Sequence, residues 1–91
     1  MSKRKFSLGQ TVITQAAEAT FERAFVVKCL ARHVSGDWGD LAPEDAKMND
    51  AGLGEHPDRL HSSYATPEGG KLWVITEIDR SVTTVLLPED Y

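Results

Sequence analysis

Three short stretches rich in β-branched and aromatic residues fill the last third of the chain, and they constrain the fold more than any other feature. They read RLHSSYAT (59–66), KLWVITE (71–77) and SVTTVLLP (81–88), and the turn-like sequences PEGG and IDR separate them. Segments of strand length that are joined by short turns predict an antiparallel β-meander. The middle segment has apolar groups on both faces, because Trp73 and Ile75 alternate with Leu72 and Val74. We therefore predict that it is a central strand.

The first half of the chain is dominated by helix-forming residues. Apolar side chains recur at steps of three and four between residues 15 and 34, while Lys28 and Arg32 fall on the opposite side. A continuous helix of that length would span about 30 Å, which is long for such a small domain. Two helices with a break near residues 19–24 are therefore favoured over one long helix. Pro43, with acidic residues directly after it, predicts a further helix over 43–51.

Together these patterns predict one α+β domain over residues 1–91. Two or three helices would pack on a three- to four-stranded antiparallel sheet, with QTVIT (10–14) as an additional short strand. Residues 1–9 are predicted to be flexible, because three consecutive basic residues repel one another there. One face of the sheet would carry the helices. The other would be covered by the N-terminal segment, a partner or a second copy of the chain.

Charge is unevenly distributed along the chain. The net charge is −4, yet residues 37–58 alone contain seven carboxylates and a single lysine. Direct binding of DNA or RNA normally requires clustered basic residues, and no basic stripe runs through the folded part. Membrane association is not expected either, because no apolar run approaches the roughly 18 residues of a membrane helix. The basic start lacks the apolar stretch of a signal peptide, so a cytoplasmic location is predicted.

The decapeptide RHVSGDWGDL (32–41) collects the most chemically active residue types. Gly36 suits the left-handed position that ends a helix, and Asp37 and Asp40 suit turns and caps because their short side chains accept backbone hydrogen bonds. Two alternatives remain for Trp38. It is either a lid over the core or an exposed aromatic anchor of the kind enriched at protein interfaces.

A metal or thiol enzyme is one alternative interpretation. Cys29 and His33 are four residues apart, so they would share one face of a helix, and Asp37 follows closely. However, structural zinc requires four ligands and the chain has no second cysteine. A thiol among apolar neighbours is expected to be buried and inert. With no phosphate loop, GxSxG or HExxH motif present, we expect neither a cofactor nor a catalytic set.

Two stretches, ARHVSGDWGDL (31–41) and TPEGGKLWVITEIDRSVTTVLLPEDY (66–91), resemble a family of short bacterial proteins. Its members occur on plasmids and other mobile elements and are sometimes labelled as type I restriction subunits. A methyltransferase subunit would need a cofactor-binding domain that does not fit in 91 residues. The resemblance implies an accessory protein of mobile DNA, and it assigns no catalytic residue.

The sequence therefore predicts a non-catalytic protein-binding module that binds a protein partner or associates with itself. Two tryptophans, an acidic middle segment and the absence of a complete catalytic set motivate this interpretation. The candidate binding residues are His33, Asp37, Trp38 and Asp40 on one surface and Asp79 and Arg80 on another. Arg80 could instead be a surface ion-pair partner of Glu77 and Asp79. A sharper alternative is an acidic inhibitor of a nucleic-acid-processing defence complex, in which carboxylates occupy phosphate positions.

Overall fold

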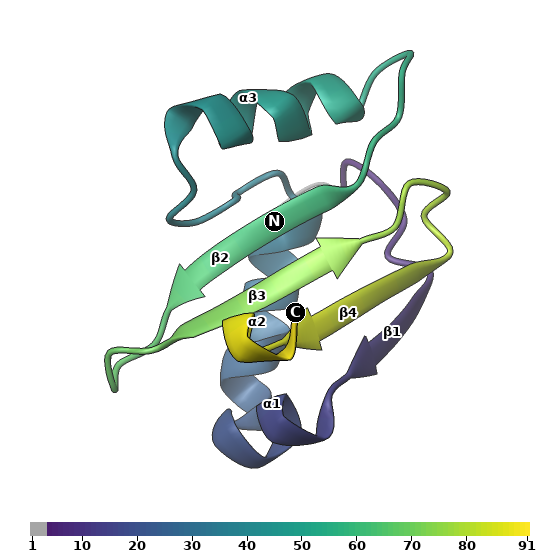
Figure 1. The fold of residues 1–91 in the computed structure, drawn as a ribbon. Coiled ribbons are helices and arrows are strands. Elements are labelled where there is room, and N and C mark those ends of the chain that lie inside the picture. The colour runs from purple at the N-terminus through teal and green to yellow at the C-terminus, as the bar shows by residue number, and fades with distance from the viewer. Residues whose placement is uncertain (1–3) are drawn as a thin grey trace.

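A four-stranded sheet and three α-helices make up the described part of the chain, residues 4–91 of a computed structural model (Figure 1). The elements follow in the order β1 (Gln10–Ile13), α1 (Gln15–Thr20), α2 (Arg23–Val34), α3 (Pro43–Gly52), β2 (Leu60–Ala65), β3 (Lys71–Thr76), β4 (Val82–Leu86) and the 3-10 helix η1 (Pro88–Asp90). The predicted α+β class is confirmed. Among these residues no helix has the length and apolar character that crossing a bilayer requires.

The strands lie side by side in the order β1-β4-β3-β2. β2, β3 and β4 form the predicted antiparallel meander, with Ser63 opposite Trp73 and Val74 opposite Val85. β3 is a central strand, as its two apolar faces indicated. β1, however, runs parallel to β4, so the sheet is not wholly antiparallel. Three helices separate β1 from β2 along the chain, and no tight turn therefore dictates the direction of β1.

The helical region is broken where the sequence favoured a break. α1 begins at the cap residue Thr14, whose Oγ1 accepts a hydrogen bond from the Ala17 N–H at 3.1 Å. Phe21 then adopts an extended backbone conformation before α2 begins. α2 ends as predicted, because Gly36 has a φ of +87° and its N–H donates to the His33 carbonyl at 3.0 Å.

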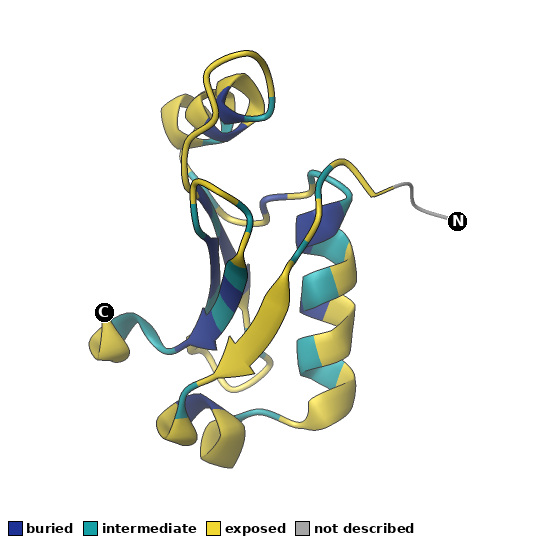
Figure 2. Ribbon diagram, turned by 90° about the vertical axis from the view of Figure 1, so that its right-hand side faces the viewer, coloured by how far each residue is buried: buried dark blue, intermediate teal, exposed yellow. Residues whose placement is uncertain are grey.

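The two faces of the sheet are covered differently (Figure 2). α2 packs on one face, where the buried cluster lies. Its members are Ala17, Cys29, Tyr64, Leu72, Val74 and Val85. On the other face the ring of Trp73 contacts Tyr91, which follows η1, and α3 lies beyond β2. The far face is therefore covered by the chain's own C-terminal half only in part.

Residues 1–9 were predicted to be flexible, and residues 1–3 of this segment lie outside the described part of the chain. From Lys5 onward the segment contacts the fold. The Lys5 N–H donates to the Val34 carbonyl at 2.8 Å, and the Leu8 carbonyl accepts from Thr83 Oγ1 at 2.7 Å. Phe6 lies beside the rings of His33 and Trp38. These contacts attach the segment to the end of α2 and to β4.

Candidate functional site

The segment that follows α2 closes the outer edge of β2. Gly39 forms an isolated parallel bridge with Ser63. The Ser63 N–H donates to the Trp38 carbonyl at 3.1 Å, and the Asp40 N–H donates to the Ser63 carbonyl at 2.7 Å. Gly39 has a φ of +75°, and a Cβ there would overlap the Ser63 carbonyl oxygen. Glycine is therefore required at this position for both its conformation and its size.

Trp38 lies in the core rather than on the surface. Only 6% of it is exposed, and its ring stacks on Phe6 with the ring centroids 6.2 Å apart. The indole Nε1–H donates to Asp50 Oδ1 of α3 at 3.0 Å. Trp38 therefore covers the core, and the alternative of an exposed anchor for a partner is wrong.

Asp37 is held by its neighbours in sequence. Arg32 Nε and Nη2 donate to its two carboxylate oxygens at 2.7 and 3.2 Å, and the Gly39 N–H donates to Oδ1. The Arg32 hydrogen bond lowers the pKa of Asp37 from its ordinary value. Its backbone carbonyl accepts from the Tyr64 hydroxyl at 2.6 Å. Asp37 therefore shapes the turn with both its side chain and its backbone.

His33 belongs to a buried chain of hydrogen bonds that joins the helix to three strands. Nδ1 contacts Ser62 Oγ, Nε2 contacts Thr76 Oγ1 at 2.9 Å, and Thr76 contacts Thr83 at 2.7 Å. Thr83 donates its hydroxyl proton to the Leu8 carbonyl, which can only accept. Thr83 must then accept from Thr76, and Thr76 must accept from Nε2–H. Burial lowers the pKa of the imidazole to about 3, so the ring is neutral and its unprotonated Nδ1 accepts from the Ser62 hydroxyl.

The proposed enzyme residues do not combine into one site. Cys29 is completely buried, and burial raises the pKa of its thiol. Both ring nitrogens of His33 contact hydroxyl groups, and Asp37 is engaged by Arg32. Ser62 and His33 resemble a nucleophile and its base, but neither is accessible to a substrate. Across residues 4–91 no group of three metal-ligating side chains comes together.

Arg80 anchors backbone and does not pair with the nearby carboxylates. Its guanidinium donates to backbone carbonyls of the β3–β4 turn and of the segment from α3 to β2. These acceptors are Gly52, Asp58, Glu77 and Ile78, at 2.6 to 3.2 Å. Glu77 faces Arg59 at 3.5 Å, and Asp79 accepts from Ser81. The prediction that Arg80 forms ion pairs with Glu77 and Asp79 is therefore wrong, because its guanidinium donates to backbone carbonyls instead.

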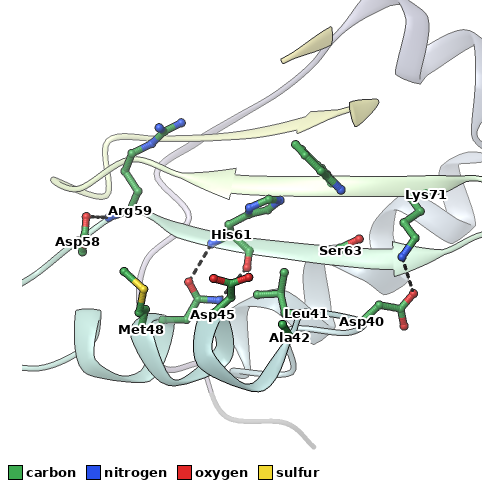
Figure 3. Close-up of a pocket in the computed structure, with 12 residues that line it drawn as sticks. Asp40, Leu41, Ala42, Asp45, Met48, Asp58, Arg59, His61, Ser63 and Lys71 are labelled. Atoms are coloured by element: carbon green, nitrogen blue, oxygen red, sulfur yellow. Dashed lines mark hydrogen bonds and ion pairs between the residues drawn. The ribbon is translucent and has the colours of Figure 1, made fainter. Parts of the chain in front are cut away.

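An open groove lies between α3 and the far face of β2 and β3, and we name it the α3 groove. Its volume is about 520 Å³. The lining residues are Asp40, Leu41, Ala42, Asp45, Met48, Asn49, Asp58, Arg59, His61, Ser63, Lys71 and Trp73. Figure 3 shows side chains of α3 and β2 facing one another along the groove, from Met48 and Arg59 at one end to Asp40 and Lys71 at the other.

Asn49 fixes α3 to the strand that borders the groove. Its Nδ2 donates to the His61 carbonyl at 2.7 Å, and its Oδ1 accepts from the His61 N–H at 3.2 Å. Asn49 is 5% exposed, so these bonds are shielded from water. The amide thus replaces the missing neighbouring strand at His61, as the Trp38–Asp40 backbone does at Ser63.

The His61 ring is the least satisfied polar group in the described chain. Its Nε2 is buried and has no hydrogen-bond partner among residues 4–91. The ring contacts the edge of Trp73, with centroids 4.4 Å apart. Burial lowers the pKa of His61, while the nearby Asp45 opposes that shift. The imidazole of His61 therefore lines the groove with one ring nitrogen that has no hydrogen-bond partner in the described chain.

Apolar and acidic groups accompany it in the groove. Met48 is 63% exposed, which is high for a large apolar side chain. Asp40 and Lys71 form a loose ion pair at 3.5 Å, with both side chains about half exposed. Asp45 has no ion-pair partner within the described residues. The groove therefore offers an apolar surface beside an unpaired carboxylate.

Of the sequence candidates only Asp40 lines the α3 groove. His33 lies in α2, Asp37 and Trp38 lie in the segment that follows α2, and Asp79 and Arg80 belong to the turn between β3 and β4. The sequence did indicate one part of the groove, since the second apolar face of the 71–77 segment includes Trp73. Asn49 and His61 were missed because only the fold brings α3 beside β2.

No family model matches the chain, and neither does a curated protein or a solved structure. The interpretation of the candidate site therefore depends on its own geometry.

Proposed function

We propose that this protein is a non-catalytic protein-binding module and that the α3 groove receives an extended segment of the partner. The observation that carries the proposal is the exposed Met48 in a groove that also holds the unpartnered, buried Nε2 of His61. Exposed methionine and partly buried aromatic groups are typical of adaptable protein-binding surfaces. Because Nε2 is closed to solvent, a backbone N–H or side-chain donor of the partner would reach it only if the side chains that cover it shift on binding.

The chemistry of the groove indicates which partner segment fits. Asp45 favours a lysine or arginine, because the carboxylate has no cationic partner of its own in the described chain. Trp73 and Met48 favour an apolar side chain next to that basic residue. The lining extends along the length of α3, which suits an extended chain better than a compact small molecule. The expected ligand is a peptide segment with a basic and an apolar residue close together.

The acidic-inhibitor alternative gains less support. Of the carboxylates in 37–58, Asp37, Asp40 and Asp50 are engaged in contacts within the chain. Engaged carboxylates are a poor substitute for the regularly spaced phosphates of a duplex. A role as an accessory protein of mobile DNA stays a prediction from the family resemblance, and it is compatible with a protein partner.

Selection of binders from a random peptide library tests the proposal without knowledge of the natural partner. Selected peptides are expected to carry a lysine or arginine next to an apolar residue. Met48→Glu should weaken their binding more than tenfold, which corresponds to about 1.4 kcal/mol, because it places a carboxylate on the apolar surface of the groove. Asp45→Lys should weaken binding of the same peptides by repulsion.

A matched control is available on α2. Val27 is 58% exposed, similar to Met48, but does not line the groove. Val27→Glu should therefore leave peptide affinity within about twofold of the wild type. Equal loss of binding in both variants, or selected peptides without basic residues whose affinity ignores Asp45→Lys, would contradict the assignment of the groove.

A further inference from the structure

The strand β1 leaves one edge of the sheet uncovered. It pairs with β4 on one side only, and Figure 2 looks onto its other side. All of its residues, Gln10–Ile13, are exposed. Val12 and Ile13 are 37% and 36% exposed, and they belong to the few large apolar side chains that are exposed in the described chain. An apolar strand at a free edge is a template for pairing with another strand.

The backbone groups that face outward can be assigned from the register. The Gln10 N–H donates at 2.9 Å to the carbonyl of the residue before β4, and the Thr14 N–H donates at 3.0 Å to a carbonyl of β4. Bonding alternates along a strand, so the N–H and C=O groups of Thr11 and Ile13 point away from the sheet. Within residues 4–91 the backbone N–H and C=O groups of Thr11 and Ile13 have no hydrogen-bond partner.

β1 also lacks the features by which natural proteins block a free edge. It contains no lysine, no other charged residue and no proline. Such residues, bulges or covering loops normally prevent edge-to-edge pairing. At the opposite edge of this sheet, by contrast, Asn49 and the Trp38–Asp40 backbone bind the outward groups of His61 and Ser63 in β2. Within residues 4–91, one edge is therefore protected at these two residues and the other edge is available for pairing.

We propose that β1 pairs antiparallel with β1 of a second copy, across a twofold axis at Val12. In this register Thr11 of each copy lies opposite Ile13 of the other, and each pair exchanges hydrogen bonds in both directions. Every outward-facing group of Thr11 and Ile13 is then satisfied. Val12 lies opposite its own counterpart on the face away from α2, because its register partner is Thr84.

The surroundings of β1 favour a second copy over another partner. A groove of about 350 Å³ lies beside the strand, and Ile13, Phe21 and Val26 contribute apolar lining. Its charged residues are Glu18 and Arg23, one of each sign. A balanced pair lets two copies meet without net repulsion at the contact, although each chain carries −4.

The short strand sets the strength of this association. Stable dimers bury about 1,200 Å² or more in total, and the strand that would pair here has only four residues. We therefore expect a reversible dimer with a dissociation constant on the order of tens of micromolar. This inference does not depend on partner binding in the α3 groove.

Sedimentation equilibrium of the full chain over roughly 5 to 500 µM, on both sides of the expected dissociation constant, measures the association. The wild type should shift from monomer to dimer over this range. Val12→Lys should stay monomeric, because two lysines would lie opposite each other, whereas Met48→Lys should dimerise as the wild type does. A wild type that stays monomeric, or a Val12→Lys variant that dimerises equally, overturns the proposal.

Disulfide trapping tests the register itself. Residues opposite each other in a non-hydrogen-bonded antiparallel pair have Cα atoms about 4.5 Å apart, which a disulfide can bridge. Val12→Cys should therefore form a covalent dimer when diamide oxidises the two thiols. The native Cys29 is buried and provides little background. Met48→Cys serves as the exposed control, and trapping of that variant to the same extent as Val12→Cys would contradict the twofold register.

Discussion

The two edge strands of the sheet face the same physical problem and meet it in opposite ways. In β2 the outward backbone groups of two residues are satisfied within the chain, at His61 by the Asn49 amide and at Ser63 by the Trp38–Asp40 backbone. β1 has outward groups without such partners and exposed apolar side chains beside them. Three residues of the decapeptide 32–41, namely Trp38, Gly39 and Asp40, therefore serve to close one edge.

The closed edge also creates the groove that we propose as the binding surface. α3 is held against β2 by Asn49, and its exposed side then lies opposite His61 and Trp73. The open edge leaves β1 free for pairing with another strand. One chain would thus have two separate contact surfaces, and a dimer through β1 would present two α3 grooves.

The largest effect is expected at the closed edge, for Gly39→Ala. The new Cβ would overlap the Ser63 carbonyl, and the φ of +75° adds backbone strain. We expect a loss of about 3–4 kcal/mol in the free energy of unfolding, measured by urea denaturation. Gly69→Ala is the matched control, since its φ is +91° and nothing lies within 4 Å of the new Cβ. It should cost only about 1 kcal/mol, and equal losses would contradict the steric role of Gly39.

A smaller loss is expected for Asn49→Leu. This change leaves the N–H and C=O of His61 without partners while burying them, which should cost about 2–3 kcal/mol in urea denaturation. Asn49→Asp keeps the acceptor for the His61 N–H but places a carboxylate oxygen against the His61 carbonyl, so it should also be destabilising. If Asn49→Leu were as stable as the wild type, the amide would not be what closes this edge.

Acid should destabilise the fold through His33, whose network includes β2, β3 and β4 but no residue of β1. The unfolded imidazole binds a proton below about pH 6.5, whereas the folded one stays neutral down to about pH 3. The contribution of His33 to the free energy of unfolding is therefore fully present above pH 6.5. Between pH 6.5 and pH 3 the free energy of unfolding falls by about 1.4 kcal/mol per pH unit, or by about 2 kcal/mol in total at pH 5.

Urea denaturation at several pH values measures this slope. His33→Gln retains a donor and an acceptor but no titrating ring, so its stability should depend less on pH between 6.5 and 5. The remaining slope would come from His61, whose pKa is lowered as well. Equal slopes in the wild type and in His33→Gln would contradict a neutral, buried His33.

The smallest effect is expected at the open edge. Val12→Lys changes an exposed side chain whose backbone bonds to β4 are kept, so the unfolding free energy of the monomer should change by less than about 0.5 kcal/mol. The measurement belongs at low micromolar concentration, where the dimer contributes little. A loss comparable to that of Asn49→Leu would show that β1 is as integral to the fold as β2.

Most of the fold was predictable because local patterns in the sequence determine its helices and strands. Alternation and turn residues predicted the meander, apolar periodicity predicted the helical region, and the length of a continuous helix favoured the break before α2. The candidate site was far less predictable. Arg80 and Asp37 were candidate binding residues because they are charged. Their charge does not reveal that Arg80 donates hydrogen bonds to carbonyls of a distant loop, or that Asp37 accepts hydrogen bonds from Arg32.

The helices and strands and their apolar faces follow from local sequence, since helix caps, periodicity and turn chemistry act between residues a few positions apart. The parallel placement of β1, the burial of Trp38 and the neighbours of His33 and Asn49 arise only when the chain folds. These depend on contacts between residues 12 to 75 positions apart in the chain. No local pattern encodes them, because the free energy of such contacts exists only once the whole sheet has assembled.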